Sequence, residues 1–181
     1  GPRGRDYYGG DLAGVIEQLG YLQALGITAI YFNPIFDGGS NHGYDTQDYA
    51  RIDPYFGSND DFDALFAAAD AHGIRLILDG VFNHTSSDSP WFDRYAHYEE
   101  VGACEAVESE WRAWYYMTTS RGPCVGPDGE GESNYQSWFG FDTLPILLKN
   151  QPQLREYFID APDSITRRWL EAGAAGWRLD V

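Results

Sequence analysis

Apolar positions in the first part of the chain alternate between helical spacing and short continuous runs. Between Asp11 and Ala24 the large apolar residues fall on one helical face: Leu12, Val15, Ile16, Leu19 and Leu22. Asp11 is a suitable N-cap, and Gly26 ends the helix. The run 27–32 then predicts a buried strand, which the following Asn-Pro dipeptide terminates.

The same pattern repeats after a polar loop over residues 37–57. Ser58 and Asp61 have the approximate spacing of a capping box for a second helix. The apolar face of this helix is formed by Phe62, Leu65, Phe66 and Ala69. The run 74–78 predicts a second buried strand, which stops at Asp79.

No sustained period is present over residues 85–150, where Trp, Tyr, Gly, Pro and acidic residues are mixed. This stretch is too long for an ordinary connection, so it predicts a small subdomain inserted after the second of these strands. Helical spacing returns at Pro152, is interrupted at Pro162 and ends at Gly173. The last apolar run, 177–181, predicts a third strand.

Three helix-then-strand units in series predict a parallel α/β sheet with right-handed crossovers. This order fits both a barrel and a doubly wound open sheet. No Gly-x-Gly-x-x-Gly or Walker sequence follows any of the strands, which argues against nucleotide binding. The 181 residues are few for a complete (β/α)8 barrel, which usually needs about 250 residues.

The composition of the chain argues against some classes of binding partner. The formal net charge is −16, and the chain contains 6 Trp and 13 Tyr. Such an acidic chain should repel nucleic acid and anionic membranes, and no apolar stretch approaches the length of a membrane span. An acidic, aromatic-rich surface suits a neutral polar ligand that stacks on rings, such as a carbohydrate. Solubility alone explains the charge equally well.

Cys104 and Cys124 are the only cysteines, and they flank an irregular aromatic stretch. We expect a disulfide between them, worth roughly 3 kcal/mol in the chain-entropy model. Such a bond indicates an oxidising compartment, so we expect a secreted or extracytoplasmic protein whose signal peptide lies outside these residues. Two free thiols in a cytosolic protein are the alternative.

Charged side chains stand at the end of the third predicted strand. Arg178 and Asp180 are two positions apart on one strand, so both lie on the same face. A carboxylate beside a guanidinium stays ionised at neutral pH, as a nucleophile or an electrostatic stabiliser requires. A structural ion pair explains the same spacing equally well.

Asp79, Asn83 and His84 close the preceding strand, and their spacing suits hydrogen bonding into a cleft. One Asp, one Asn and one His without a second cluster of ligands are weak evidence for a metal site. His84 considered alone is more often a hydrogen-bonded structural histidine.

Two groups of aromatic residues are candidates for ligand contact. Tyr44 follows the first strand, is flanked by Gly and Asp, and could stack on a sugar, with His42 beside it. Ordinary loop packing is the alternative for Tyr44. Trp138, Phe139 and Phe141 form a second cluster, for which packing inside the inserted subdomain is the favoured interpretation.

These motifs occur together in one known family. The chain resembles the α-amylase family, glycoside hydrolase family 13, over its whole length and in the family's order. The matching segments are 9–12, 26–34, 42–49, 52–57, 79–84, 144–145 and 176–180.

The segment 138–145 is most similar to the branch that contains neopullulanase, maltogenic amylase and amylopullulanase. The run 144–147, Leu-Pro-Ile-Leu, departs from the Pro-Lys-Leu-Asn or Pro-Asp-Leu-Asn form that is common there. Linkage preference therefore stays open.

The resemblance implies an α/β fold, namely a fragment of a (β/α)8 TIM barrel that carries strands 2–4, with domain B inserted after strand 3. Residues 1–84 would hold helix 1, strand 2, helix 2 and strand 3. Residues 85–145 would form domain B, and residues 146–181 would hold helix 3 and strand 4.

The resemblance also implies roles for individual residues. Asp180 matches the catalytic nucleophile, and Arg178 matches the arginine that holds it. His84 resembles the histidine that hydrogen-bonds the sugar in the cleaved subsite, and Tyr44 resembles the tyrosine that stacks beneath that sugar. His42 belongs to the same substrate-binding segment.

Asp79 resembles a supporting carboxylate of the family. Asn83 matches a position that binds calcium in some members but not in all. The chemistry itself requires no cofactor, so calcium is left open.

The implied activity is hydrolysis of α-glucans such as starch and maltooligosaccharides, with retention of configuration through a covalent glycosyl-enzyme on Asp180. The family takes its acid/base from a Glu on the fifth strand, beyond Val181. We therefore expect these residues alone to be inactive and, because the sheet has unpaired edges, unstable. The alternative is a catalytically silent amylase-like scaffold, against which the joint presence of the matched site residues argues. The oligomeric state is open.

Overall fold

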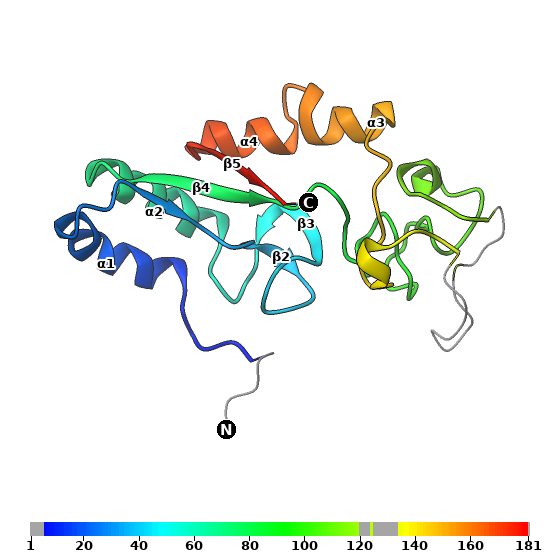
Figure 1. The fold of residues 1–181 in the computed structure, drawn as a ribbon, viewed down its shortest axis with the longest axis horizontal. Coiled ribbons are helices and arrows are strands. Elements are labelled where there is room, and N and C mark those ends of the chain that lie inside the picture. The colour runs from blue at the N-terminus through cyan, green and yellow to red at the C-terminus, as the bar shows by residue number, and fades with distance from the viewer. Residues whose placement is uncertain (1–5, 120–123, 125–133, 181) are drawn as a thin grey trace.

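The computed structural model describes residues 6–119, 124 and 134–180 (Figure 1). Within these residues no helix has the length and apolar character needed to cross a membrane. The elements follow in this order: α1 (Leu12–Ala24), β1 (Ala29–Tyr31), β2 (Phe36–Gly38), β3 (Thr46–Ile52), α2 (Asn59–Ala71), β4 (Arg75–Gly80), the 3₁₀ turns η1 (Glu110–Trp114) and η2 (Trp138–Gly140), α3 (Pro152–Arg155), the π-helical turn η3 (Glu156–Asp160), α4 (Ile165–Ala172) and β5 (Gly176–Leu179).

The central sheet is parallel and has the strand order β1-β4-β5. Ile30 pairs with Leu76, and Asp79 pairs with Arg178. Each strand lies beside the one that precedes it in the parallel series, so the order contains no reversal. A doubly wound sheet reverses its strand order at a switch point, whereas a barrel continues in one direction.

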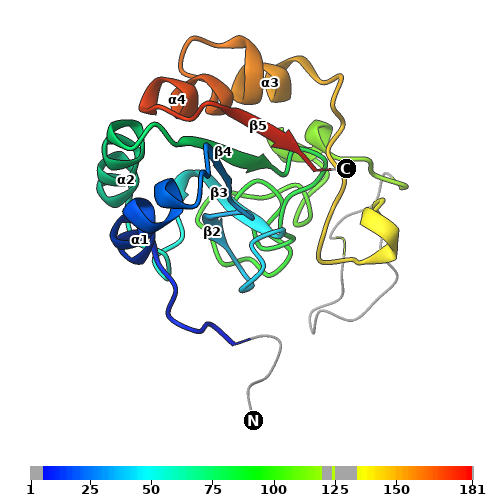
Figure 2. The ribbon, with the colours of Figure 1, turned by 60° about the vertical axis from the view of Figure 1, so that its left-hand side comes forward.

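The helices that connect these strands cover one face of the sheet. Trp169 of α4 meets Phe62 of α2 edge to face, with ring centroids 5.1 Å apart. Figure 2 shows α1, α2 and α4 in an arc around the strands. Because both crossovers use the same face, the opposite face carries the ends of Tyr31 and Arg178, which is the arrangement of a barrel wall.

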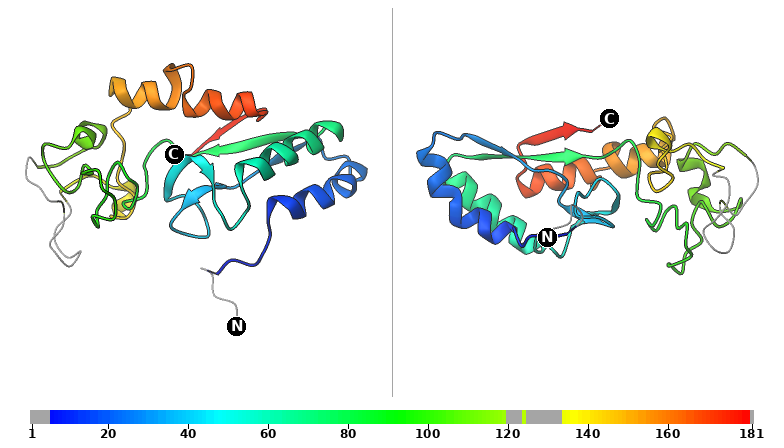
Figure 3. Two further views of the ribbon diagram at one scale, coloured as in Figure 1. Left: turned by 180° about the vertical axis from the view of Figure 1, so that it is seen from behind. Right: turned by 60° about the horizontal axis from the view of Figure 1, so that its bottom comes forward.

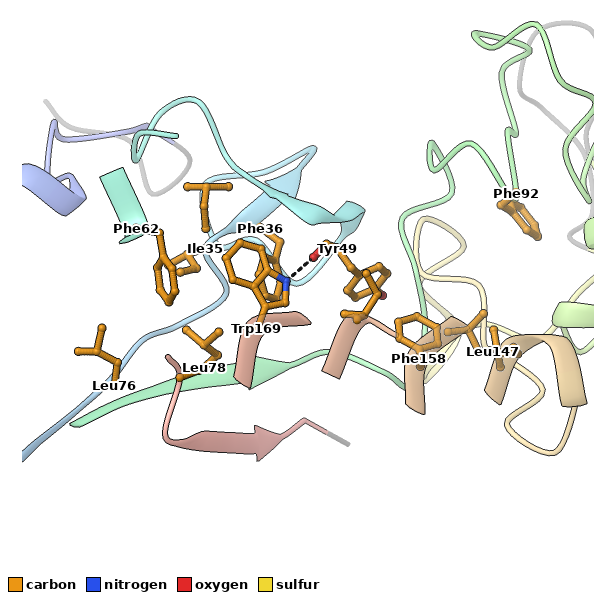
Figure 4. Packing of buried hydrophobic residues seen from close by; sticks show 14 of the residues in the cluster. Ile35, Phe36, Tyr49, Phe62, Leu76, Leu78, Phe92, Leu147, Phe158 and Trp169 are labelled. Atoms are coloured by element: carbon orange, nitrogen blue, oxygen red, sulfur yellow. Dashed lines mark hydrogen bonds between the residues drawn. The ribbon is translucent and has the colours of Figure 1, made fainter. Parts of the chain in front are cut away.

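The core is centred on Trp169, which is 2% exposed. Its ring packs against Phe36 at 5.0 Å, and its indole N–H donates to the carbonyl oxygen of Tyr49 at 2.8 Å (Figure 4). Tyr49 is itself buried and donates its hydroxyl to the carbonyl oxygens of Val81 and His84. The helix face, the β2–β3 hairpin and the segment after β4 are therefore held together by one set of buried contacts.

The local signals for the first two helices are confirmed. Asp11 caps α1 by accepting from the backbone N–H of Gly14 at 2.7 Å. Ser58 and Asp61 form a reciprocal capping box at the start of α2. The break at Pro162 is also present, because η3 ends at Asp160 and a new helix starts at Ile165.

Two predictions for strands are wrong in part. The segment 37–57 is not simply a polar loop, because it contains most of the antiparallel β2–β3 hairpin. The strand predicted over 27–32 is shorter, and Ala29 and Tyr31 of β1 are exposed rather than buried. The exposed positions face the uncovered side of the sheet, whereas Ile30 packs toward the helices.

The described parts of the segment 85–145, namely 85–119, 124 and 134–145, lie beyond the carboxyl end of β4, at one end of the molecule (Figure 3). The two ends of the segment meet, since the N–H of Thr85 donates to Pro145 O at 3.2 Å and the N–H of Leu147 donates to Asn83 O at 3.0 Å. The division into barrel segments 1–84 and 146–181 around domain B stays a prediction that these contacts favour.

A pair of glycines offers a matched test of the packing between α2 and α4. Gly173 has a φ of +120°, and a Cβ built on it would lie 2.2 Å from the ring of Phe66. Gly73 has a φ of +67°, and nothing lies within 4 Å of its Cβ position. Gly173→Ala should therefore lower the free energy of unfolding by about 3 kcal/mol through strain and overpacking. Gly73→Ala should cost about 1 kcal/mol through strain alone.

Urea unfolding of both variants, followed by circular dichroism, measures this difference. Equal losses in the two variants would show that Phe66 does not constrain the turn after α4.

Candidate active site

A buried carboxylate lies at the end of β4. Asp79 is 1% exposed, and its Oδ2 accepts hydrogen bonds from the hydroxyl groups of Tyr31 and Tyr44, the latter at 3.2 Å. The Nη1 of Arg178 lies 3.2 and 3.1 Å from its two oxygens. A buried charge is tolerated when it is paired and hydrogen-bonded, and Asp79 meets both conditions.

Arg178 connects Asp79 to Asp180. The sheet register places Arg178 directly opposite Asp79, and its Nη1 also donates to Asp180 Oδ1 at 2.5 Å. The hydrogen bonds to Asp180 and then to Asp79 raise the pKa of Arg178, so the guanidinium stays charged. The predicted ion pair of Arg178 and Asp180 is present, and a second carboxylate shares the same arginine.

Asp180 lies at the carboxyl end of β5. Its backbone N–H donates to Gly80 O at 3.1 Å, which continues the strand pairing, and its side chain is 12% exposed. The backbone and Arg178 therefore fix the carboxylate at the edge of a cavity.

The imidazole of His84 is buried between two partners. Its Nε2 lies 2.9 Å from the carbonyl oxygen of Tyr44, and its Nδ1 lies 3.3 Å from the amide nitrogen of Asn83. Since the amide nitrogen is a donor, the network assigns Nδ1 as acceptor and Nε2 as donor. Burial lowers the pKa of His84, which favours the neutral ring. Both nitrogens are engaged within the protein, so the predicted hydrogen bond from His84 to a sugar stays a prediction.

The predicted residues Tyr44, His42, His84 and Asp180 line one cavity of about 460 Å³. Its remaining lining residues are Asp45, Trp138, Phe141, Thr143 and Leu144. The N–H of Tyr44 donates to His42 Nδ1 at 3.1 Å, while its hydroxyl is held by Asp79. The tyrosine ring is thereby fixed in position at the wall of a cavity whose size suits a sugar.

Two other cavities lie nearby, and neither is lined by Tyr44 or His84. One of about 620 Å³ lies beside α1 and includes Leu12, Val15 and Phe32 in its walls. Another of about 520 Å³ is lined by apolar side chains from β5, α3 and η3, by Lys149, and on its other side by Asp180. Of these three cavities we assign the site to the smallest, because there Asp180, which Arg178 holds, lies together with Tyr44 and His84.

Sequence reasoning missed Tyr31 and gave the wrong emphasis to Trp138 and Phe141. Tyr31 donates to Asp79, and the guanidinium of Arg178 lies 5.9 Å from its ring centroid. Its position at the end of the first strand was the available signal. Trp138 and Phe141 do not only pack within the inserted segment, because both line the cavity.

The predicted disulfide is not formed in the structure. Cys104 and Cys124 are buried free thiols, although they are neighbours, since the N–H of Cys124 donates to Cys104 O at 2.7 Å. The side-chain hydrogen bond with Cys124 and then burial raise the pKa of the Cys104 thiol. The expectation of a secreted protein rested on that bond and stays a prediction.

The environment of Asn83 does not fit a calcium ion. The ammonium of Lys149 donates to Asn83 Oδ1 at 2.6 Å, so a cation already holds the oxygen that would ligate a metal. Calcium prefers a cage of several oxygen ligands. In the part of the chain that the structure describes, no three His, Cys, Asp or Glu residues are grouped to hold a metal ion.

Known proteins are similar to this chain in both sequence and fold. Amylopullulanase from Thermoanaerobacter thermohydrosulfuricus is 42% identical, with 97% of this chain and 12% of the relative covered. Neopullulanase 2 from Thermoactinomyces vulgaris is 38% identical over 99% of this chain and 28% of its own length. The chain therefore spans under a third of either relative.

A solved structure extends the similarity to three dimensions. The cyclic α-maltosyl-(1→6)-maltose hydrolase from Arthrobacter globiformis, in complex with maltose, matches with a TM-score of 0.83 and 34% identity. The match covers 99% of this chain and 38% of that one. The prediction of a TIM-barrel fragment is confirmed, since such neighbours are barrel enzymes.

The family model described as the alpha amylase catalytic domain matches residues 3–181. Parallel order, one-sided helices and the Asp79–Arg178–Asp180 network agree with this match. The chain belongs to the alpha-amylase family.

Proposed function

We propose that the protein hydrolyses α-glucans with retention of configuration and that Asp180 is its nucleophile. One observation carries this proposal: Arg178 holds the Asp180 carboxylate at the wall of the cavity that Tyr44 and His84 also line. The relatives are named amylopullulanase, neopullulanase and cyclomaltodextrinase, which supports α-glucans as the substrate class.

In the proposed reaction Asp180 attacks the anomeric carbon as the bond to the leaving oxygen breaks. A second carboxylic acid protonates that oxygen, and its conjugate base then removes a proton from the water that releases the sugar. Arg178 orients Asp180, while Tyr44 supports the sugar ring from below. We expect the second acid to be the Glu of the fifth strand, outside residues 1–181.

A silent amylase-like scaffold is the second candidate. It accounts for the fold but does not require a carboxylate at the wall of a cavity. The shared arginine between Asp79 and Asp180 favours the enzyme, because a merely structural pair would be complete with Asp79 alone.

Replacing the proposed nucleophile tests this function. Asp180→Asn in the full-length protein should lower kcat on starch by a factor of about 10³ or more, because no covalent intermediate forms. Glucan binding should remain, since the amide keeps the shape of the carboxylate. Reducing-sugar release measures the first effect, and calorimetry with maltoheptaose measures the second.

Asp63→Asn is the matched control, because Asp63 is an exposed carboxylate on α2, outside the cavity. Near-normal turnover by Asp180→Asn would refute the assignment. The first product anomer, observed by proton NMR, should be α, and an initial β product would refute retention.

We also expect residues 1–181, produced alone, to release no reducing sugar from starch. Asp180 without the second carboxylic acid cannot protonate the leaving oxygen. Turnover by this chain at the rate of a complete enzyme would show that its own residues supply the acid.

We further propose that the fold around Asn83 needs no calcium, because Lys149 supplies the positive charge there. Dialysis of the full-length protein against EDTA should leave both the unfolding temperature and the rate on starch unchanged. A loss of either that added Ca²⁺ restores would contradict this proposal.

A further inference from the structure

Tyr31 approaches the Asp79 carboxylate from the strand on the side away from Arg178. The parallel register of β1 and β4 places Tyr31 opposite Ile77. Asp79 follows Ile77 by two positions, so its side chain lies on the same face of the sheet as that of Tyr31. The hydroxyl of Tyr31 donates to Asp79 Oδ2, and Arg178 of β5 lies opposite Asp79 on the other side. The carboxylate of the central strand is therefore held from both neighbouring strands.

Most of the donor groups around Asp79 are uncharged. Its Oδ2 accepts from the hydroxyls of Tyr31 and Tyr44 and from Arg178 Nη1, the last at 3.1 Å. Its Oδ1 lies 3.2 Å from the same nitrogen. The two hydroxyls satisfy part of a buried carboxylate that would otherwise depend on the arginine.

One nitrogen of Arg178 serves two carboxylates at unequal distances. Nη1 lies 2.5 Å from Asp180 Oδ1, whereas its distances to the oxygens of Asp79 are 3.1 and 3.2 Å. Hydrogen bonds between ions are shorter when they are stronger, so the closer engagement is with Asp180. This division requires that other donors supply Asp79.

Tyr31 contacts both partners of this arrangement. Burial and then the hydrogen bond to Asp79 raise the pKa of Tyr31, so its hydroxyl stays protonated and remains a donor. The guanidinium carbon of Arg178 lies over the Tyr31 ring, 5.9 Å from its centroid. This distance is within the range of a cation–π contact. The hydroxyl therefore acts on Asp79, while the ring face lies against Arg178.

We propose that Tyr31 is a positioning residue for the proposed nucleophile, because its hydroxyl satisfies Asp79 and thereby leaves Nη1 of Arg178 with Asp180. This inference rests on the proposed function. Without the hydroxyl, Asp79 would be a buried carboxylate that lacks a donor, which is unfavourable. The Arg178 side chain is 45% exposed and that of Asp79 is 0% exposed, so the arginine is the partner that can move. Its movement toward Asp79 would release Asp180.

Tyr31→Phe in the full-length protein tests this role, because it removes the hydroxyl and keeps the ring over Arg178. The kcat on maltoheptaose should fall about tenfold, since the nucleophile is less well oriented. KM should stay within about twofold, because Tyr31 is not among the described residues that line the cavity. Steady-state kinetics separate the two effects.

Tyr115→Phe is the matched control. It removes another buried tyrosine hydroxyl, which lies 3.0 Å from Thr85 Oγ1 and makes no contact with Asp79. Urea unfolding should show a similar loss of stability in both variants, whereas kcat should fall only in Tyr31→Phe. An unchanged kcat in folded Tyr31→Phe would overturn the proposal and leave the proposed function intact. Equal losses of kcat in the two variants, or a change in KM alone, would also overturn it.

Failure of the unmodified protein to hydrolyse maltoheptaose would refute the proposed function. The position of Arg178 is then tested without activity, by labelling carboxylates with a water-soluble carbodiimide and glycine amide. Tandem mass spectrometry reports the rate at Asp180, and Asp180→Asn identifies the signal. Tyr31→Phe should label Asp180 several times faster than the unmodified protein, because Arg178 no longer covers this carboxylate. Equal rates in the two proteins would refute the positioning role.

Discussion

The carboxylate of Asp79 is the constraint on which the site depends. A buried negative charge is stable only when donors surround it, and here the donors come from three separate parts of the chain: β1, the segment before β3, and β5. Each of these donors is positioned by its hydrogen bond to the Asp79 carboxylate. The carboxylate thus joins two strands and a loop more specifically than apolar packing could.

The same network determines the geometry of the cavity. Arg178 is positioned by Asp79 and in turn positions Asp180, while the hydroxyl of Tyr44 donates to Oδ2 of the same Asp79 carboxylate. Asp180, the proposed nucleophile, and the Tyr44 ring, the proposed support for a sugar, are therefore both positioned by the Asp79 carboxylate. Such indirect placement holds the Asp180 carboxylate in one position at the wall of the cavity, which is the preorganisation that the proposed catalysis requires.

Local sequence signals predicted the helices well, but they did not predict the register in which the strands pair. The caps at Asp11 and Ser58 depend on neighbours within a few residues, so the sequence displays them directly. The contact of Asp79 with Arg178 depends on register across the sheet, which no local pattern encodes. β3 was missed because its buried residues, Thr46, Tyr49 and Ile52, recur every third position where bulges interrupt the pairing with β2. The aromatic loop was misjudged because composition does not distinguish a packed ring from an exposed one.

The closed base of segment 85–145 has a consequence for how such proteins diversify. The first and last residues of the segment are joined by the hydrogen bonds Thr85–Pro145 and Leu147–Asn83. The strands that precede and follow the segment are therefore connected in the same way whatever its outer part contains. Insertions or deletions in the outer part of the segment need not propagate into the barrel, and loop-closure entropy grows only slowly with length. One scaffold can therefore carry inserted segments of different size, which reshape the opening of the cavity while the residues at the ends of β4 and β5 keep their positions.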